Sequence, residues 1–151
     1  MENKNIPVEE AYRTLMIIWF GLFMSQLMFF VLVFFAKPEL FSLDLSRPAL
    51  GGNPPIILIF FLLALSNLVL SLFLGKMFID RAIEEQKVPL VQTAMIIGCA
   101  LCESISLLGI FLAFILSYQY FFIWILLGIF GMTLHFPKRA HIQAAGFKKP
   151  N

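Results

Sequence analysis

One acidic residue lies inside an apolar part of this sequence, and its side chain has the clearest potential for chemistry. Glu103 stands near the middle of the apolar run from Val91 to Leu116. A carboxylate at such a depth costs about 3 kcal/mol on insertion scales, so it is normally protonated, paired or functional. No Lys, Arg or His lies within any apolar run. We therefore expect Glu103 to bind a proton, with a packing role between helices as the alternative.

The other reactive side chains do not form a catalytic pattern. Cys99 and Cys102 are spaced like metal ligands, but a structural zinc site needs four ligands, so we interpret them as packing residues. His135 and His141 follow the last apolar run with Lys138–Arg139 between them, which is typical of contacts to anionic lipid headgroups. No nucleophile–base pair, phosphate loop or nucleotide motif occurs. The sequence thus predicts a protein that is not an enzyme and needs no metal or cofactor.

The composition places these residues in a membrane. Of the 151 residues, 60% are apolar and 13% are charged, whereas a soluble domain is nearer half apolar and a quarter charged. The apolar residues occur in long blocks, as in bilayer-spanning helices. A net charge of +2 gives no basic surface that would indicate a nucleic-acid partner. We expect a single integral membrane domain over residues 1–151, in contact with lipid.

Four transmembrane helices are predicted, at about residues 15–36, 56–75, 91–116 and 120–135. At about 1.5 Å per residue, the first three are long enough to cross a hydrocarbon core of about 30 Å. The fourth is short and is stopped by Pro137, so it spans barely or at a thin place. The first span contains only two polar residues, Ser25 and Gln26. The predicted fold is an all-α membrane protein made of two helical hairpins.

The basic residues set the predicted orientation. Nine of the eleven lie in the two terminal tails and in the middle loop: Lys4, Arg13, Lys76, Arg81, Lys87, Lys138, Arg139, Lys148 and Lys149. Only Lys37 and Arg47 lie on the other side. The positive-inside rule then places both termini in the cytoplasm. We expect the membrane to be a bacterial inner membrane.

Two polar residues of the second span are candidate hydrogen-bond partners of the Glu103 carboxyl. If the second and third spans form a hairpin that turns near Ile83–Glu84, equal helical rise brings Ser66 and Asn67 level with Glu103. Both residues have packing between helices as an alternative role.

Small residues occupy a different face of the third span, more than a quarter-turn from Glu103. Such residues let another helix backbone approach closely, and we expect the second span to pack there. The residues of this face are Gly98, Gly109 and Ala113.

The sequence around Glu103 resembles the carboxylate-bearing helix of the proteolipid ring subunit, subunit c, of rotary ATP synthases. In that family a Gln-Thr opens the helix, Ile-Gly and Ala-Leu precede the ion-binding Glu, and a Gly and an Ala-Phe follow it. The corresponding residues here are Gln92, Thr93, Ile97, Gly98, Ala100, Leu101, Glu103, Gly109, Ala113 and Phe114. Gly75–Lys76 is similar to the end of the family's first helix, so the resemblance covers about residues 56–116.

The resemblance implies a membrane subunit that binds and releases a proton at Glu103 while related chains or other membrane subunits pack beside it. An Arg of a partner would face the ionised carboxyl. Ser104 matches a Ser of sodium-binding members and is a third candidate partner of the carboxyl, but Leu70 stands where those members carry a Gln, so sodium is not implied. Residues 64–71 lack the family's glycine stripe. The alternative therefore stays open that the chain is a non-transporting structural or assembly subunit of a larger membrane complex.

Overall fold

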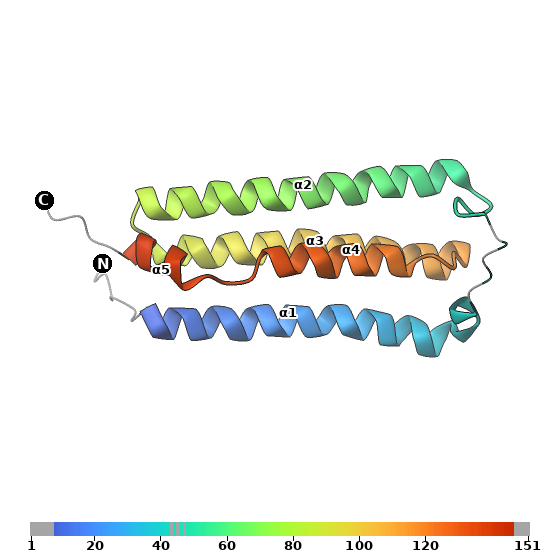
Figure 1. Ribbon diagram of the computed structural model, residues 1–151, viewed down its shortest axis with the longest axis horizontal. Coiled ribbons are helices and arrows are strands. Elements are labelled where there is room, and N and C mark those ends of the chain that lie inside the picture. The colour runs from blue at the N-terminus through green and yellow to red at the C-terminus, as the bar shows by residue number, and fades with distance from the viewer. Residues whose placement is uncertain (1–7, 43, 45, 47, 147–151) are drawn as a thin grey trace, which may run out of the picture.

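The computed structural model describes residues 8–42, 44, 46 and 48–146 as a bundle of helices (Figure 1). The helices are α1 (Val8–Ala36), α2 (Pro54–Glu84), α3 (Val88–Leu116), α4 (Phe122–Leu134) and α5 (Arg139–Gly146), with a short 3-10 helix η1 (Pro38–Phe41). Because these described residues contain no strand, the all-α prediction is confirmed. Four basic residues used above for the orientation lie outside the described residues: Lys4, Arg47, Lys148 and Lys149.

Three helices, α1, α2 and α3, are long and apolar enough to cross a membrane. They contain 29, 31 and 29 residues, which corresponds to about 43 to 47 Å of helical rise. This exceeds a hydrocarbon core of about 30 Å, so each helix also extends beyond the apolar layer. The prediction of long apolar helices at these three places is confirmed.

The fourth predicted span is a single short helix. α4 runs from Phe122 to Leu134 and has 13 residues, a rise of only about 20 Å. Residues 135–138 then leave the helix, and α5 follows at the end of the bundle (Figure 1). Pro137 accounts for the break, since proline has no amide hydrogen and its ring disrupts the preceding turn. The short apolar helix predicted at about residues 120–135 is thus present, with bounds 122–134.

Proline and left-handed residues determine where the long helices begin and end. α2 and α3 each have proline in their first turn, at Pro54–Pro55 and Pro89, where an amide hydrogen would have no partner in the helix. Gln86, with φ of 52°, lies in the turn after α2, and Ser117, with φ of 47°, ends α3. The left-handed backbone at these two residues lets the chain reverse its direction within a few residues.

α3 lies at the centre of the bundle. It packs against α1, α2 and α4, and Figure 1 shows α1 and α2 on its two sides with α4 in front of it. Of the three long helices it has the largest buried share. α5 lies beside the first turns of α1, where Arg139 Nη2 is 3.1 Å from Glu9 Oε1. The helix that carries Glu103 is thus the one with the most protein around it.

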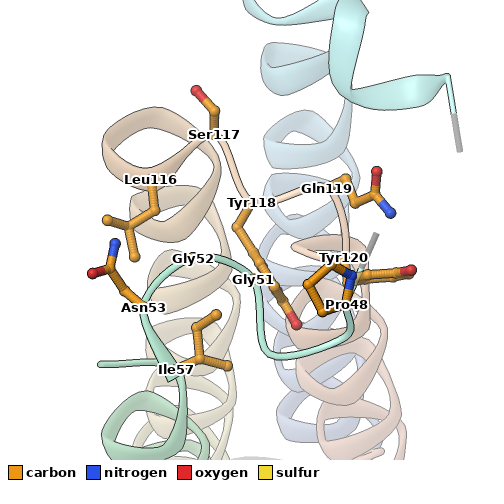
Figure 2. Close-up of a pocket in the computed structure, with 10 residues that line it drawn as sticks. All are labelled: Pro48, Gly51, Gly52, Asn53, Ile57, Leu116, Ser117, Tyr118, Gln119 and Tyr120. Atoms are coloured by element: carbon orange, nitrogen blue, oxygen red, sulfur yellow. The ribbon is translucent and has the colours of Figure 1, made fainter. Parts of the chain in front are cut away.

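A loop covers the other end of the bundle. Figure 2 shows Tyr118 extending from the turn after α3 toward the residues that precede α2. Its hydroxyl donates to the carbonyl oxygen of Ala49 at 2.6 Å, and Gln119 Nε2 donates to that of Asp44 at 2.7 Å. A cavity of about 390 Å³ remains between the two segments. Gly51, with φ of 58°, brings the loop close, since a Cβ there would lie 3.3 Å from the Tyr118 ring.

Candidate proton-binding site

Glu103 lies near the midpoint of α3 and contacts α1. Its side chain is half-buried, and its Oε1 lies 2.6 Å from Ser25 Oγ. The same Ser25 oxygen lies 2.9 Å from the carbonyl oxygen of Leu22, in the preceding turn of α1. The hydrogen-bond partner of the carboxyl is therefore on the first long helix.

The three predicted partners of the carboxyl have other positions. Asn67 of α2 is near the depth of Glu103, as expected, but its Nδ2 donates to Ser104 Oγ at 2.8 Å. Ser104 itself donates to the carbonyl oxygen of Leu101 at 2.7 Å. Ser66 is exposed on α2. The correction has a simple cause: neighbouring residues of a helix point about 100° apart, so Glu103 contacts α1 while Ser104 contacts α2.

Ser25 and Gln26 belong to the site, and their only signal in the sequence is that they are the two polar residues of the apolar run 15–36. Gln26 is fully buried, and Ser106 Oγ of α3 donates to its Oε1. The Nε2 atom of Gln26 is buried and has no hydrogen-bond partner among the described residues. Buried amides normally have partners, and Gln26 Nε2 is an exception. The Ser25–Glu103 and Gln26–Ser106 contacts concentrate polar groups where α1 meets the middle of α3.

The small residues of α3 pack against the segment after α3. A Cβ at Gly109 would lie 2.7 Å from Trp124 Cβ, and a Cβ at Gly98 would lie 2.5 Å from Cε1 of His135. Ala113 is fully buried in the same apolar cluster as Trp124. The expectation that α2 occupies this face is therefore corrected: the close approach at both glycines is made by α4 and by the residue that follows it.

His135 points into the bundle, so its expected contact with lipid headgroups is corrected. Its Nε2 lies 3.2 Å from Ser71 Oγ of α2, and Cys102 Sγ lies 3.7 Å from the same oxygen. Ser71 donates its own hydrogen to the carbonyl oxygen of Leu68 at 2.7 Å. The Ser71 oxygen is therefore an acceptor for the imidazole, which places a hydrogen on Nε2.

The polar side chains around the middle of α3 form separate groups. Ser25 and Glu103 join α1 to α3, Asn67 joins α2 to α3, and the His135 group lies nearer α5. Cys99 and Cys102 are free and buried, and no three metal-ligating side chains cluster within the described ranges. The titratable side chains of these groups are the Glu103 carboxyl, the His135 imidazole and the two cysteine thiols. Compared with models of protein families, with curated proteins and with solved structures, the chain matches none.

Proposed function

We propose that this chain is a proton-binding membrane subunit and that Glu103 is the group that takes up and releases the proton. The observation that carries the proposal is the position of Ser25 Oγ, within hydrogen-bond distance of both the Glu103 carboxyl and a backbone carbonyl. The proposal keeps the resemblance to the proteolipid ring subunit of rotary ATP synthases as its second support.

The hydrogens at Ser25 favour a protonated carboxyl. A hydroxyl has one hydrogen to donate, yet Ser25 Oγ lies 2.6 Å from Glu103 Oε1 and 2.9 Å from the carbonyl oxygen of Leu22. If Glu103 carries a proton, it donates to Ser25 Oγ, and Ser25 donates to Leu22. Both contacts are then full hydrogen bonds. If Glu103 is ionised, the single hydroxyl hydrogen of Ser25 must serve two acceptors, the carboxylate and the Leu22 carbonyl. Both hydrogen bonds are therefore fully formed only when Glu103 carries a proton.

The surroundings of Glu103 also favour the neutral form. It lies near the midpoint of a 29-residue apolar helix, where hydrocarbon disfavours a charge. The ion pairs among the described residues are at the ends of the helices and none includes Glu103. Release of the proton therefore requires water or an Arg of a partner subunit, as the resemblance implies.

An exposed face of α3 provides room for such a partner. Beside Glu103 lie Ile96, Ala100, Leu107 and Phe111, and all four are exposed. Related chains or other membrane subunits would pack here, bringing a partner residue to the carboxyl. In the proposed arrangement both termini are cytoplasmic, the membrane is a bacterial inner membrane, and residues 122–138 complete a fourth crossing.

Labelling with a hydrophobic carbodiimide tests the proposal, because the reagent enters the bilayer and activates only a protonated acid. We expect mass spectrometry to show one adduct, on the peptide containing Glu103, that fades as the pH is raised. The other eight of the nine acidic residues are internal controls, since they lie in tails, loops and helix ends. Glu103→Gln should abolish the adduct. An unmodified Glu103 at pH 6 would contradict the proposal.

The second candidate function is a structural or assembly subunit. It is favoured by the place of α3 inside its own bundle and by Ala64 and Ser71, fully buried residues of α2 where a ring subunit would have glycines. Particle images of the detergent-extracted protein separate the two functions. A closed ring of identical chains supports the proton-binding subunit, and single copies among other subunits support the structural role.

A further inference from the structure

The break between α4 and α5 lines a small cavity at the end of the bundle where α5 lies. Its volume is about 60 Å³, and because about 10–15 Å³ is enough for one water molecule, it has room for several. Every long helix contributes to its wall, with Leu15 from α1, Gly75 from α2 and Ala94 from α3. The wall also includes His135 and Lys138 from the broken segment and His141 from α5.

The irregular backbone of this segment is compatible with water in the cavity. Such backbone is tolerated at membrane depth only where it is buried in protein or lines a water-filled cavity. His135 lies beside Gly75, next to Lys76, where the apolar part of α2 ends. The cavity is thus at the boundary of the hydrocarbon layer and extends into the bundle from there.

The bundle is shaped to hold the His135 ring. Gly75 and Gly98 face the imidazole from α2 and α3, and a Cβ at Gly75 would lie 3.1 Å from its Cε1. Nε2 donates to Ser71 Oγ across 3.2 Å. The basic nitrogen of this tautomer is therefore Nδ1, which accepts a proton when the imidazolium forms.

We propose that this cavity is an aqueous inlet and that His135, on its inner wall, is a second proton-exchanging site. Water in the inlet delivers a proton to Nδ1, the resulting imidazolium keeps its Nε2 hydrogen bond to Ser71, and the proton returns to water by the same route. The site does not depend on the proposed role of Glu103, because the hydrogen bonds of the described residues do not join the two groups.

The elements that pack around the inlet contribute different charged or titratable groups. The broken segment contributes Lys138, and α5 contributes His141. α2 contributes Asp80 beside His141, and α3 contributes the Cys102 thiol through Ser71. The wall residue of α1 is apolar. Burial and the nearby Lys138 lower the pKa of His141, while Asp80 opposes this. Lys138 lies on the cavity wall, and protonation of His135 adds a positive charge to the same cavity.

Nitrogen NMR of the histidine rings, in the full chain reconstituted in nanodiscs, tests the proposal. The chain has two histidines, so His141→Gln leaves one ring to observe. We expect both ring nitrogens of His135 to shift as the pH of the buffer is lowered from 8 to 4, with the Nε2–H tautomer as the neutral form. A ring that keeps one protonation state throughout would overturn the proposal.

Labelling of single added cysteines tests the inlet separately. Ala94→Cys lies on the cavity wall and is 1% exposed in the native residue, whereas Leu72→Cys, next to Ser71 on α2, is directed to lipid and is 43% exposed in the native residue. A charged, water-soluble thiol reagent should modify Ala94→Cys from one side of the membrane and leave Leu72→Cys unmodified. The native cysteines are fully buried and give the baseline. Equal reactivity of the two variants, or an unreactive Ala94→Cys, would contradict a water-filled inlet.

Discussion

The His135 imidazole occupies a space that exists only because Gly98 has no side chain. A Cβ at this position would lie 2.5 Å from Cε1 of the ring, closer than van der Waals contact allows. We predict that Gly98→Ala lowers the free energy of unfolding by about 1–3 kcal/mol, which is typical of overpacking. Thermal unfolding in detergent, followed by circular dichroism, measures the change.

Gly21 is the matched control for this substitution. It lies within α1, and a Cβ there would meet nothing within 4 Å. Gly21→Ala should leave the stability unchanged or raise it by up to about 1 kcal/mol, because alanine favours a helix more than glycine does. If both variants unfold at the same temperature, the His135 ring moves aside freely and its close fit against Gly98 does not contribute to the free energy of unfolding.

At single residues, the sequence predicts which side chains are exceptional better than it predicts their partners. Glu103 stands out because it is an acid in an apolar run, and Asn67 is near its predicted depth. The partner of Glu103, Ser25, depends on the rotation of α1 about its own axis. That rotation follows from packing against α3 and α4, including the hydrogen bond from Trp19 Nε1 to the carbonyl oxygen of Met132 at 3.1 Å. The hydropathy pattern of α1 alone does not predict this rotation.

The contact of α3 with α4 depends on the absence of a side chain at Gly109. A Cβ there would lie 2.7 Å from Trp124 Cβ and 2.8 Å from the carbonyl oxygen of Phe121, and a backbone atom cannot rotate away. We predict that Gly109→Leu separates α4 from α3 and greatly reduces the yield of folded protein, measured by size-exclusion chromatography. Ile110→Leu, at a half-buried neighbour, should be tolerated. Equal yields would mean that α4 is not held tightly.

The turn between α2 and α3 carries a charge cluster whose effect depends on pH. Hydrogen bonds from Lys87 and Arg81 lower the pKa of Glu85 to about 2. Because the pKa falls on folding, the stabilisation is present above the unfolded value of about 4.3 and is lost as the pH falls toward 2. We predict a titration midpoint near 2 for the Glu85 carboxyl in NMR spectra, and a smaller stability loss between pH 4.5 and 2 in Glu85→Gln. A midpoint near 4 would contradict the cluster.

At the level of elements, length decides what the sequence predicts. The three long helices follow directly from apolar runs that exceed the thickness of the bilayer. The sequence also predicts that the fourth segment is short and stops before Pro137, and α4 has 13 residues. Its break is stabilised by tertiary contacts of His135 with Ser71 and Gly98, and α5 is held by buried Ile142 and Ala145. These contacts join residues far apart in the sequence, so local patterns do not predict them.

For the molecule as a whole, the positions of the two described ends fit the proposed even number of crossings. Figure 1 shows the start of α1 and the end of α5 at the same end of the bundle. α1, α2 and α3 provide three passes along its length, so residues 117–146 make the return. The return is possible although α4 is short, because the four residues 135–138 are not helical and cover more distance per residue than a helix does.

The predicted orientation follows from this arrangement and from the basic residues. The end of the bundle with α5 carries Arg13, Lys76, Arg81, Lys87 and Lys138–Arg139, whereas the opposite end has Lys37 within the described ranges. The positive-inside rule predicts that the α5 end faces the cytoplasm.

Two added cysteines on exposed residues test this orientation: Gln143→Cys in α5 and Leu50→Cys in the loop before α2. We predict that a membrane-impermeant thiol reagent added to intact cells labels Leu50→Cys alone, and that Gln143→Cys reacts only after the cells are opened. The native Cys99 and Cys102 are fully buried and give the background in both cases. Labelling of Gln143→Cys from outside would invert the orientation, and the inlet at His135 would then open to the exterior.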